Sequence, residues 1–215
     1  PRFLTIGTLL EIPPPIDTPV ALTQTTESVP ANLEVQHWDC QPNGPAWVCG
    51  GWLKNYSTTP YAAIELAAFL PNTAIPQTTV GTALPILAAQ AQVPFYVRST
   101  SPMLTIQLQQ AYPAESVIQQ FPMLAATALS QTETTVTVQV RNPTAQTFDT
   151  VWLVVAQVWP DGRLAQYRTV TLALTAQSDS TIRLDLPKIP ETTLWLAAQG
   201  SVAVSNVITP GTTGP

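Results

Sequence analysis

Charged residues are scarce in this chain of 215 residues: they make up 10% of the sequence, whereas about a quarter is typical of soluble domains. Eight Lys and Arg residues are scattered among thirteen Asp and Glu residues, and the net charge is −5 at pH 7. Nucleic-acid binding takes much of its affinity from clustered basic side chains. The composition therefore predicts that nucleic acid is not a partner.

Histidine and glycine are also scarce, with one histidine, His37, and nine glycines. Any Ser–His or Cys–His arrangement must use His37, which shares the face of Leu33 and Val35 and is predicted to be a half-buried strand residue. Glu34 and Asp39 lie nearby, but solvated acids at strand ends are commoner than catalytic dyads. No spacing matches a metal site, a calcium loop or a phosphate-binding loop. We therefore expect no enzymatic activity, metal or cofactor.

Long apolar runs are missing as well. The longest, residues 62–70, contains Glu65 and is far shorter than the roughly 20 residues of a membrane-spanning helix. We therefore expect no transmembrane segment. The first residues show neither an initiating Met nor a signal-peptide pattern, so we expect a processed chain.

Only two cysteines occur, Cys40 and Cys49, and they flank Gln-Pro-Asn-Gly-Pro-Ala-Trp-Val. The centre of this stretch is a strong turn signal, and a turn would bring the flanking residues within reach of a disulfide. The alternative is a pair of buried thiols. Disulfides are typical of oxidising compartments, so we expect an extracellular or cell-surface location.

What the sequence does contain is a clear strand pattern. Residues 135–141 alternate between apolar and polar side chains, which is typical of a strand with one buried face. Residues 142–144 break this run, an apolar run follows at 151–159, and residues 160–162 (Pro-Asp-Gly) turn the chain back. Strands joined by such turns predict an antiparallel β-sandwich.

The same pattern occurs twice. Lys54-Asn55 matches Arg141-Asn142 at a distance of 87 residues, and this offset needs no gap for about the next forty residues. Apolar positions coincide at this offset in five pairs: Tyr61 with Phe148, Ile64 with Val151, Leu66 with Leu153, Phe95 with Ile182, and Val97 with Leu184. We infer a duplicated domain.

Each copy supplies about seven strand candidates, which is typical of an immunoglobulin-like sandwich. We therefore predict an all-β chain of two tandem immunoglobulin-like antiparallel β-sandwich domains with an extended N-terminal arm. The predicted boundaries are residues 1–32 for the arm with one strand, 33–121 for domain 1, 122–208 for domain 2 and 209–215 for a C-terminal tail. The predicted strands lie near 33–38, 46–54, 61–70, 78–84, 91–98, 104–110 and 115–121, then 123–130, 134–141, 148–158, 164–174, 179–186, 193–199 and 202–208.

Three motifs resemble a known family. Val138 to Asn142, then Trp159-Pro-Asp-Gly162, then Ala176-Gln177 before a strand, resemble the small bacterial immunoglobulin-like modules of the FxLYD type. The likeness covers most of residues 134–186 and, more loosely, 47–98. It departs at the signature, where Trp159-Pro160 replaces an aromatic-Asp pair. The resemblance implies a secreted or cell-envelope protein that is not catalytic, and it implies no active-site residue.

The N-terminal arm adds one more apolar strand. Its apolar residues precede a polyproline run at 13–15 that stiffens the chain into a spacer. This strand is left over once two sandwiches are counted, and it is predicted to fold onto its own domain or to add to a neighbour's edge. The predicted assembly residues are Phe3, Leu4, Ile6, Leu9, Leu10 and Ile12.

Two further predictions each leave an alternative open. Trp52 and Trp152 are out of phase with the presumed core and are predicted on an outer face, where they either bind sugars or proteins or cover the linker or the other domain. Asn55 begins the glycosylation sequon Asn55-Tyr56-Ser57, and it is either glycosylated or a turn-capping residue.

The function that follows is adhesive rather than catalytic. We predict a non-catalytic extracellular structural subunit that self-assembles into a surface filament or layer through its N-terminal strand and sandwich edges. The alternative is an accessory or carbohydrate- or protein-binding subunit of a larger cell-surface complex. The predicted partners are copies of the chain or other cell-surface proteins, with a glycan as the alternative ligand.

Overall fold

The computed structural model describes residues 30–70, 73, 75–101 and 104–202. This part of the chain forms thirteen strands and one short 3-10 helix, with no α-helix, and every paired strand runs antiparallel to its neighbour. The predicted all-β, antiparallel character is therefore confirmed.

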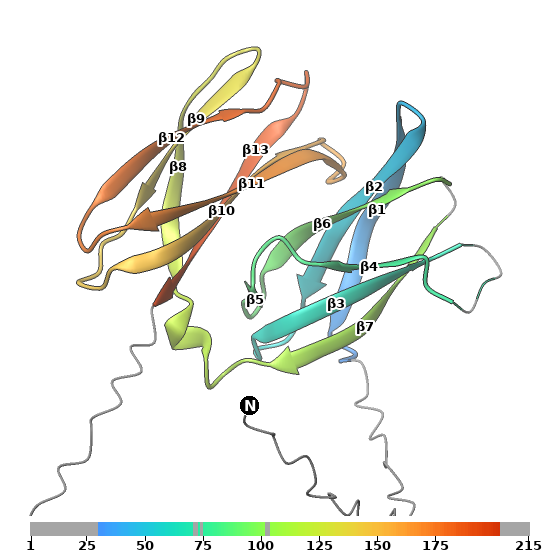
Figure 1. Ribbon diagram of the computed structural model, residues 1–215, viewed down its shortest axis with the longest axis horizontal. Helices are drawn as coiled ribbons and strands as arrows, with labels where there is room; N and C mark the ends of the chain where they lie inside the picture. The colour runs from blue at the N-terminus through green and yellow to red at the C-terminus, as the bar shows by residue number, and fades with distance from the viewer. Residues whose placement is uncertain (1–29, 71–72, 74, 102–103, 203–215) are drawn as a thin grey trace, which may run out of the picture.

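The strands divide between two halves of the chain (Figure 1). The N-terminal half contains β1 (Leu33–Asn43), β2 (Ala46–Asn55), β3 (Tyr61–Phe69), β4 (Thr78–Gly81), β5 (Ile86–Leu87), β6 (Gln92–Ser99) and β7 (Thr105–Pro113). The C-terminal half contains β8 (Met123–Gln131), β9 (Thr135–Arg141), β10 (Phe148–Val158), β11 (Leu164–Leu174), β12 (Asp179–Asp185) and β13 (Thr193–Val202).

Two sheets build the N-terminal half and one curled sheet builds the C-terminal half. In the N-terminal half, β1-β2-β6 form one sheet, while β4, β5 and β7 all pair with β3 in the other. In the C-terminal half the strand order is β11-β10-β13-β8-β9-β12. Strand β8 changes partner along its length, from β13 at Met123 and Leu124 to β9 from Ala125 onwards. This change wraps the sheet around its own core.

Strand pairing recurs at the offset of 87 residues. The pairs β1–β2, β2–β6 and β3–β7 in the N-terminal half correspond to β8–β9, β9–β12 and β10–β13 in the C-terminal half. Each half contains its own apolar cluster. Val138, Leu153 and Leu184 belong to the C-terminal cluster, and Leu53, Leu66 and Phe95 to the N-terminal one.

The two halves pack against each other through one face of β10 and β13. Leu153 and Val155 point into the C-terminal core, so their neighbours Val154 and Ala156 lie on the opposite face, because successive side chains of a strand alternate. Val154 and Ala156 are nevertheless fully buried. Val154 belongs to the apolar cluster of the N-terminal half, and Ala156 packs with Trp52. This sheet is therefore apolar on both sides.

Two predicted strands differ in the structure. Residues 115–121 contain the 3-10 helix η1 (Ile118–Gln120), because the amides of Gln120 and Phe121 donate to the carbonyls of Val117 and Ile118, three residues earlier. The strand predicted at 78–84 ends at Gly81, and a short second strand begins after Pro85, which has no amide hydrogen for a ladder. Residues 1–29 of the arm predicted at 1–32 lie outside the described part of the chain. So do residues 203–215, which include most of the strand predicted at 202–208 and the whole predicted tail at 209–215.

Candidate functional site

The histidine predicted to be half-buried, His37, is exposed. A bulge between Gln36 and Asp39 interrupts the pairing of β1 with β2, and His37 adopts a φ of 49° there. The bulge turns the side chain out of the predicted alternation, so His37 is exposed, and its ring lies against Gly162 of the C-terminal half. The prediction was wrong because alternation fails where an extra residue enters a strand.

The acids near His37 have other contacts. Asp39 Oδ1 accepts a hydrogen bond from the Cys40 amide at 2.8 Å, and Asp39 Oδ2 accepts one from Arg163 Nη1 at 3.0 Å. Glu34 is exposed. Within the described ranges no group of three or more His, Cys, Asp or Glu side chains is placed to hold a metal ion.

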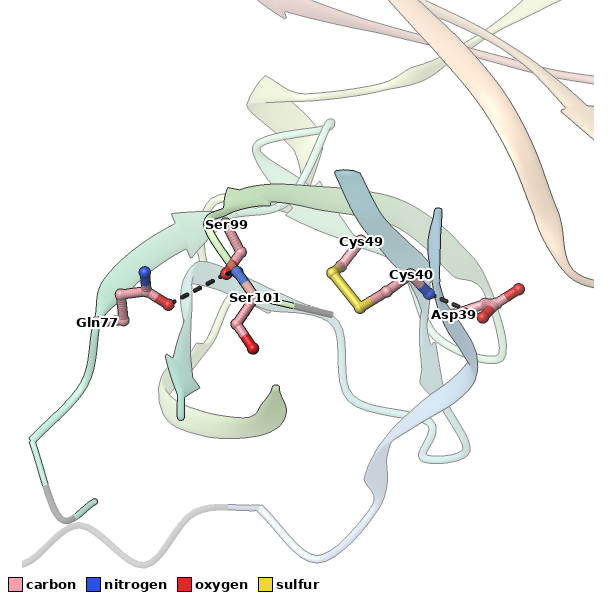
Figure 2. The surroundings of a disulfide bond; sticks show 6 residues. All are labelled: Asp39, Cys40, Cys49, Gln77, Ser99 and Ser101. Atoms are coloured by element: carbon pink, nitrogen blue, oxygen red, sulfur yellow. Dashed lines mark hydrogen bonds between the residues drawn. A yellow bond between two sulfur atoms is a disulfide. The ribbon is translucent and has the colours of Figure 1, made fainter. Parts of the chain in front are cut away.

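The predicted disulfide is present. Cys40 and Cys49 face each other across β1 and β2 and are joined by a bond (Figure 2). Cys49 is fully buried beside Val97 and Ala68. A disulfide of this kind is typical of an oxidising compartment. No helix in the described part of the chain is long and apolar enough to cross a membrane.

Trp52 is not a surface residue. It is 1% exposed, and its indole Nε1 donates to the Gly162 carbonyl at 3.1 Å. Its ring meets Trp195 edge-on, with the ring centroids 5.1 Å apart. The reading as a ligand-binding surface ring was wrong, and the alternative, that it covers the other domain, matches these contacts. The ring is on the outer face of β2, as predicted, but the C-terminal half covers that face.

Trp152 is partly buried for the same reason. It lies opposite Gln199 on β10 and β13, packs against the N-terminal apolar cluster, and has Phe121 at a centroid distance of 6.2 Å. Phe121 belongs to the segment that connects the halves. Trp152 therefore covers the connection and the interface rather than offering an open ring.

Asn55 makes the contacts of a capping residue. Its side chain is fully buried, and Nδ2 donates to the carbonyls of Thr59 and Ala88 at 2.8 and 3.0 Å. Its Oδ1 accepts from the amide and hydroxyl of Ser57. Both Nδ2 hydrogens are used inside the fold, as the turn-capping alternative predicts, and glycosylation at this sequon stays a prediction.

The second copy repeats this network atom for atom. Asn142 is 1% exposed, and its Nδ2 donates to the carbonyls of Gln146 and Thr175 at 2.7 and 2.8 Å. Its Oδ1 accepts from the amide and hydroxyl of Thr144. Each of these partners lies 87 residues after its counterpart around Asn55. The two asparagines therefore have the same structural role, to fix the turn after β2 and after β9.

One turn of the C-terminal half makes polar contacts with the N-terminal half. The turn is residues 159–163, Trp-Pro-Asp-Gly-Arg, and it is closed by backbone hydrogen bonds between Trp159 and Arg163 and between Gly162 and Trp159. Gly162 has a φ of 88°, which favours glycine. Arg163 bridges Asp39 at 3.0 Å and Asp161 at 2.7 Å, and it contributes with Trp52 to holding the halves together.

Hydrogen bonds donated by Arg163 also shift the pKa values of Asp161 and of Arg163 itself. The Arg163 backbone amide and guanidinium both donate to Asp161 and lower its pKa below the ordinary 3.8. The pKa of Arg163 is raised by the same side-chain hydrogen bond and by the one to Asp39. Both groups remain charged at neutral pH.

A polar cleft opens beside this turn, between the two halves. Its volume is about 420 Å³, and it is lined from β1, β2, β6 and β11. Arg98 of β6 and Arg168 of β11 line it and are exposed, and neither has an ion-pair partner within the described residues. The rings of Tyr96 and Tyr167 meet edge-on at 5.2 Å. We call this feature the Arg98–Arg168 cleft.

No sequence pattern predicted the cleft. Its two arginines lie 70 residues apart in the chain, and only the packing of the halves brings them to one cavity. The chain has only eight basic residues, so two of them at one cavity stand out once the fold is known.

The comparisons with known proteins do not identify the chain: no family model matches it, and no curated protein matches it. The likeness to FxLYD modules stays a prediction. The predicted assembly residues Phe3, Leu4, Ile6, Leu9, Leu10 and Ile12 lie outside the described residues.

Proposed function

We propose that this chain is a non-catalytic extracellular structural subunit that assembles with copies of itself by adding its N-terminal strand to the outer edge of β7. One observation carries the proposal. Strand β7 pairs only with β3 among the described residues, whereas its counterpart β13 pairs with both β10 and β8. The N-terminal half thus has an edge that the C-terminal half fills for itself.

The proposal treats the two halves as tandem immunoglobulin-like sandwiches, similar to FxLYD modules. The equivalent strand pairs and the equivalent buried asparagines support this assignment. In an immunoglobulin fold a seventh strand pairs with the strand that β7 represents. No such strand pairs with β7 within the described ranges.

Strand β7 has fewer of the features that protect the other edges, although its pairing with β3 shifts register at the extra residue Gln109. Natural sheets guard an edge with charges, bulges, proline or short length. Strand β1 has its bulge at residues 36–39, β6 contains Arg98, β11 contains Arg168, and β12 contains three charged residues. Strands β4 and β5 are four and two residues long. The nine residues of β7 contain no charge, and proline only at the last position.

The N-terminal segment suits this edge in length and pattern. Residues 3–12 are a match in length for the nine residues of β7, and Leu4, Ile6, Leu10 and Ile12 recur with a period of two. Ile106 and Leu108 of β7 are partly buried and border the apolar cluster of this half. A strand added beside them would cover their remaining exposed surface. The polyproline run at 13–15 disfavours a tight return to the same molecule and favours addition in trans.

The contact would be head-to-tail, because donor and acceptor are different parts of the chain. Such contacts do not close into a dimer and build filaments when the rotation does not close. The disulfide supports an extracellular or cell-surface setting for this assembly.

The experiment compares the full chain with a variant lacking residues 1–12. We expect the full chain to form larger species with rising concentration in analytical ultracentrifugation, and the deletion to stay monomeric with unchanged melting temperature. A synthetic peptide of residues 1–15 added to the deletion variant should slow amide hydrogen exchange in β7. The matched control is the same peptide with Ile6→Asp and Leu10→Asp, which should leave the exchange unchanged.

Two results would overturn the proposal. The first is a full chain that sediments as a monomer, like the deletion, at every concentration. The second is a deletion that loses several degrees of melting temperature without any change in assembly, because the strand would then fold onto its own domain.

A further inference from the structure

We propose that a second cleft between the halves is a binding site for a single-chain amphiphile with an anionic head, such as a fatty acid. This site is separate from the β7 edge and does not depend on self-assembly. The cleft has a volume of about 350 Å³, which is within the range of small-molecule sites. We call it the Lys54 cleft, and its lining includes Lys54, Gln90, Gln92, Met123, Trp195 and Ala197.

The N-terminal half contributes Lys54 of β2 and Gln92 of β6 to the cleft. These two residues are cross-strand partners, and their neighbours Leu53 and Val93 belong to the N-terminal apolar cluster. Because successive side chains of a strand alternate, Lys54 and Gln92 leave the sheet on the opposite face. This is the face on which Trp52 meets the C-terminal half.

The C-terminal half contributes Met123 of β8 and Trp195 and Ala197 of β13. Leu124 and Ala198, the residues that follow Met123 and Ala197, are buried in the C-terminal apolar cluster. Met123 and Ala197 therefore leave on the opposite face, and Trp195 shares that face with Ala197. The side chains from both halves thus face the space between them. Met123 is 51% exposed, and its flexible thioether chain can adapt to an apolar ligand.

The lining is apolar except at one place. All but three of the residues that line the cleft are apolar, and an apolar chain would remove their remaining exposed surface from water. The three polar residues lie together, because Lys54 pairs with Gln92 and its Nζ donates to the Gln90 carbonyl at 2.7 Å. No Asp or Glu is among the described residues that line the cleft. This arrangement matches a ligand that is apolar over most of its length and anionic at one end.

The ammonium group of Lys54 can accept an anion as a partner. It has three N–H donors, one of which goes to the Gln90 carbonyl, and the centre of the Tyr56 ring lies 6.0 Å from it. Glu34 is opposite Lys54 on β1, but Lys54 makes no ion pair within the described residues, and Glu34 does not line the cleft. Lys54 is only partly buried. A bound carboxylate therefore stays in contact with water, while the stem of Lys54 covers apolar surface.

The test titrates the full chain with octanoate, decanoate and decyltrimethylammonium, each below its micelle-forming concentration, by isothermal titration calorimetry. Each methylene that enters the cleft should raise the affinity about fourfold, so decanoate should bind about tenfold or more tightly than octanoate. Decyltrimethylammonium has the same chain with a cationic head and should bind more weakly than decanoate. Non-specific attraction to a protein of net charge −5 would give the reverse order.

Two variants separate the head from the chain. Lys54→Gln should weaken decanoate binding by about tenfold, because it removes a charge-assisted hydrogen bond, and should not weaken decyltrimethylammonium binding. Met123→Gln replaces an exposed side chain and should weaken both ligands, because it removes apolar surface. The matched control is Lys188→Gln, since Lys188 is an exposed lysine that does not line the cleft. It should leave all affinities unchanged.

Four results would each overturn the proposal. These are decanoate binding to Lys54→Gln as tight as to the wild type, an equal loss in Lys188→Gln, unchanged binding in Met123→Gln, and octanoate binding as tight as that of decanoate. The urea midpoint of each variant is measured alongside, and a folded Met123→Gln variant tests the chain site even if Lys54→Gln fails to fold.

Discussion

Truncation of Asn142 tests whether the buried asparagine of each copy holds its half together. Asn142→Ala removes a side chain that is 1% exposed and that joins the turn after β9 to the turn after β11. The lost hydrogen bonds are those from Nδ2 to the carbonyls of Gln146 and Thr175, and those that Oδ1 accepts from the amide and hydroxyl of Thr144.

The expected cost follows from these bonds. A hydrogen bond contributes about 1 kcal/mol net, and a buried partner left unsatisfied costs about 1–3 kcal/mol. Gln146 and Thr175 are exposed residues, and water can reach their carbonyls after truncation, so the lower value applies to each bond. We expect a loss of about 4 kcal/mol in the free energy of unfolding, about 1 kcal/mol for each of the four bonds, which is a large part of the 5–15 kcal/mol that is usual for a domain.

The assay is urea unfolding followed by tryptophan fluorescence, with the midpoint and slope compared between variants. Asn55→Ala should cost a similar amount, because its network is the same. Asn32→Ala is the control, since Asn32 is exposed and its side chain makes no hydrogen bond within the described residues. A loss below about 1 kcal/mol for Asn142→Ala would refute the reasoning, because it would mean that the network contributes less than a single bond.

Three further predictions concern the interface and the packing. Trp52→Ala should cost about 3–5 kcal/mol by opening a cavity between the halves, measured as a fall in the urea midpoint, and an unchanged midpoint would contradict it. Gly200→Ala places a Cβ 2.8 Å from the Phe148 ring and should cost about 1–3 kcal/mol, while Gly81→Ala, which meets no atom within 4 Å, should be neutral in thermal unfolding. The pKa of Asp161, measured by carbon-detected NMR, should lie below 3.8 and return towards 3.8 in Arg163→Gln. Because this pKa is lowered in the folded state, the ionised carboxylate stabilises the fold at pH values above 3.8. That stabilisation is lost as the pH falls through the folded pKa.

Sequence patterns predicted the strands well because each copy has one core and repeats its inward positions. Val136, Val138 and Val140 alternate with polar residues, and all three are fully buried in the C-terminal cluster. The turn between Cys40 and Cys49 was equally readable, because Asn-Gly favours a tight reversal and the two cysteines then face each other. Local signals of this kind depend on neighbours within a few residues.

The interface was harder to predict because it joins distant parts of the chain. Alternation predicted that Trp52 lies on the outer face of β2, and it does, but alternation says nothing about what covers that face. One pattern in the sequence does indicate the interface. The run from Val151 to Val158 is apolar almost without a break, which is typical of a strand buried on both faces. Applied to β10, that rule predicts a second layer of protein over Trp152 and Val154.

The two halves dock through different surfaces, and neither half has the docking surface of the other. Under the proposed self-assembly, this bears on how one molecule would contact the next. On β10 and β13 the docking face includes Trp152, Val154 and Trp195, and the equivalent positions of the N-terminal half, 87 or 88 residues earlier, are Glu65, Ala67 and Gln107. On the other side, Trp52 and Tyr96 correspond to Gln139 and Arg183 of the C-terminal half.

Apart from the buried Ala67, these counterparts of the interface residues are polar. If these counterpart residues were apolar, the N-terminal half of one molecule could dock on the C-terminal half of the next. That head-to-tail contact does not close. The polar replacements block this stacking, in the way that natural proteins design against unwanted contacts. Under the proposed self-assembly, these polar faces favour contact through strand edges rather than sheet faces, and among the described edges β7 is the long one without charge. A pair of variants, Glu65→Leu and Gln107→Leu together, should therefore induce face-to-face association even in the chain that lacks residues 1–12, and sedimentation of that chain as a monomer would show that the faces play no part in this control.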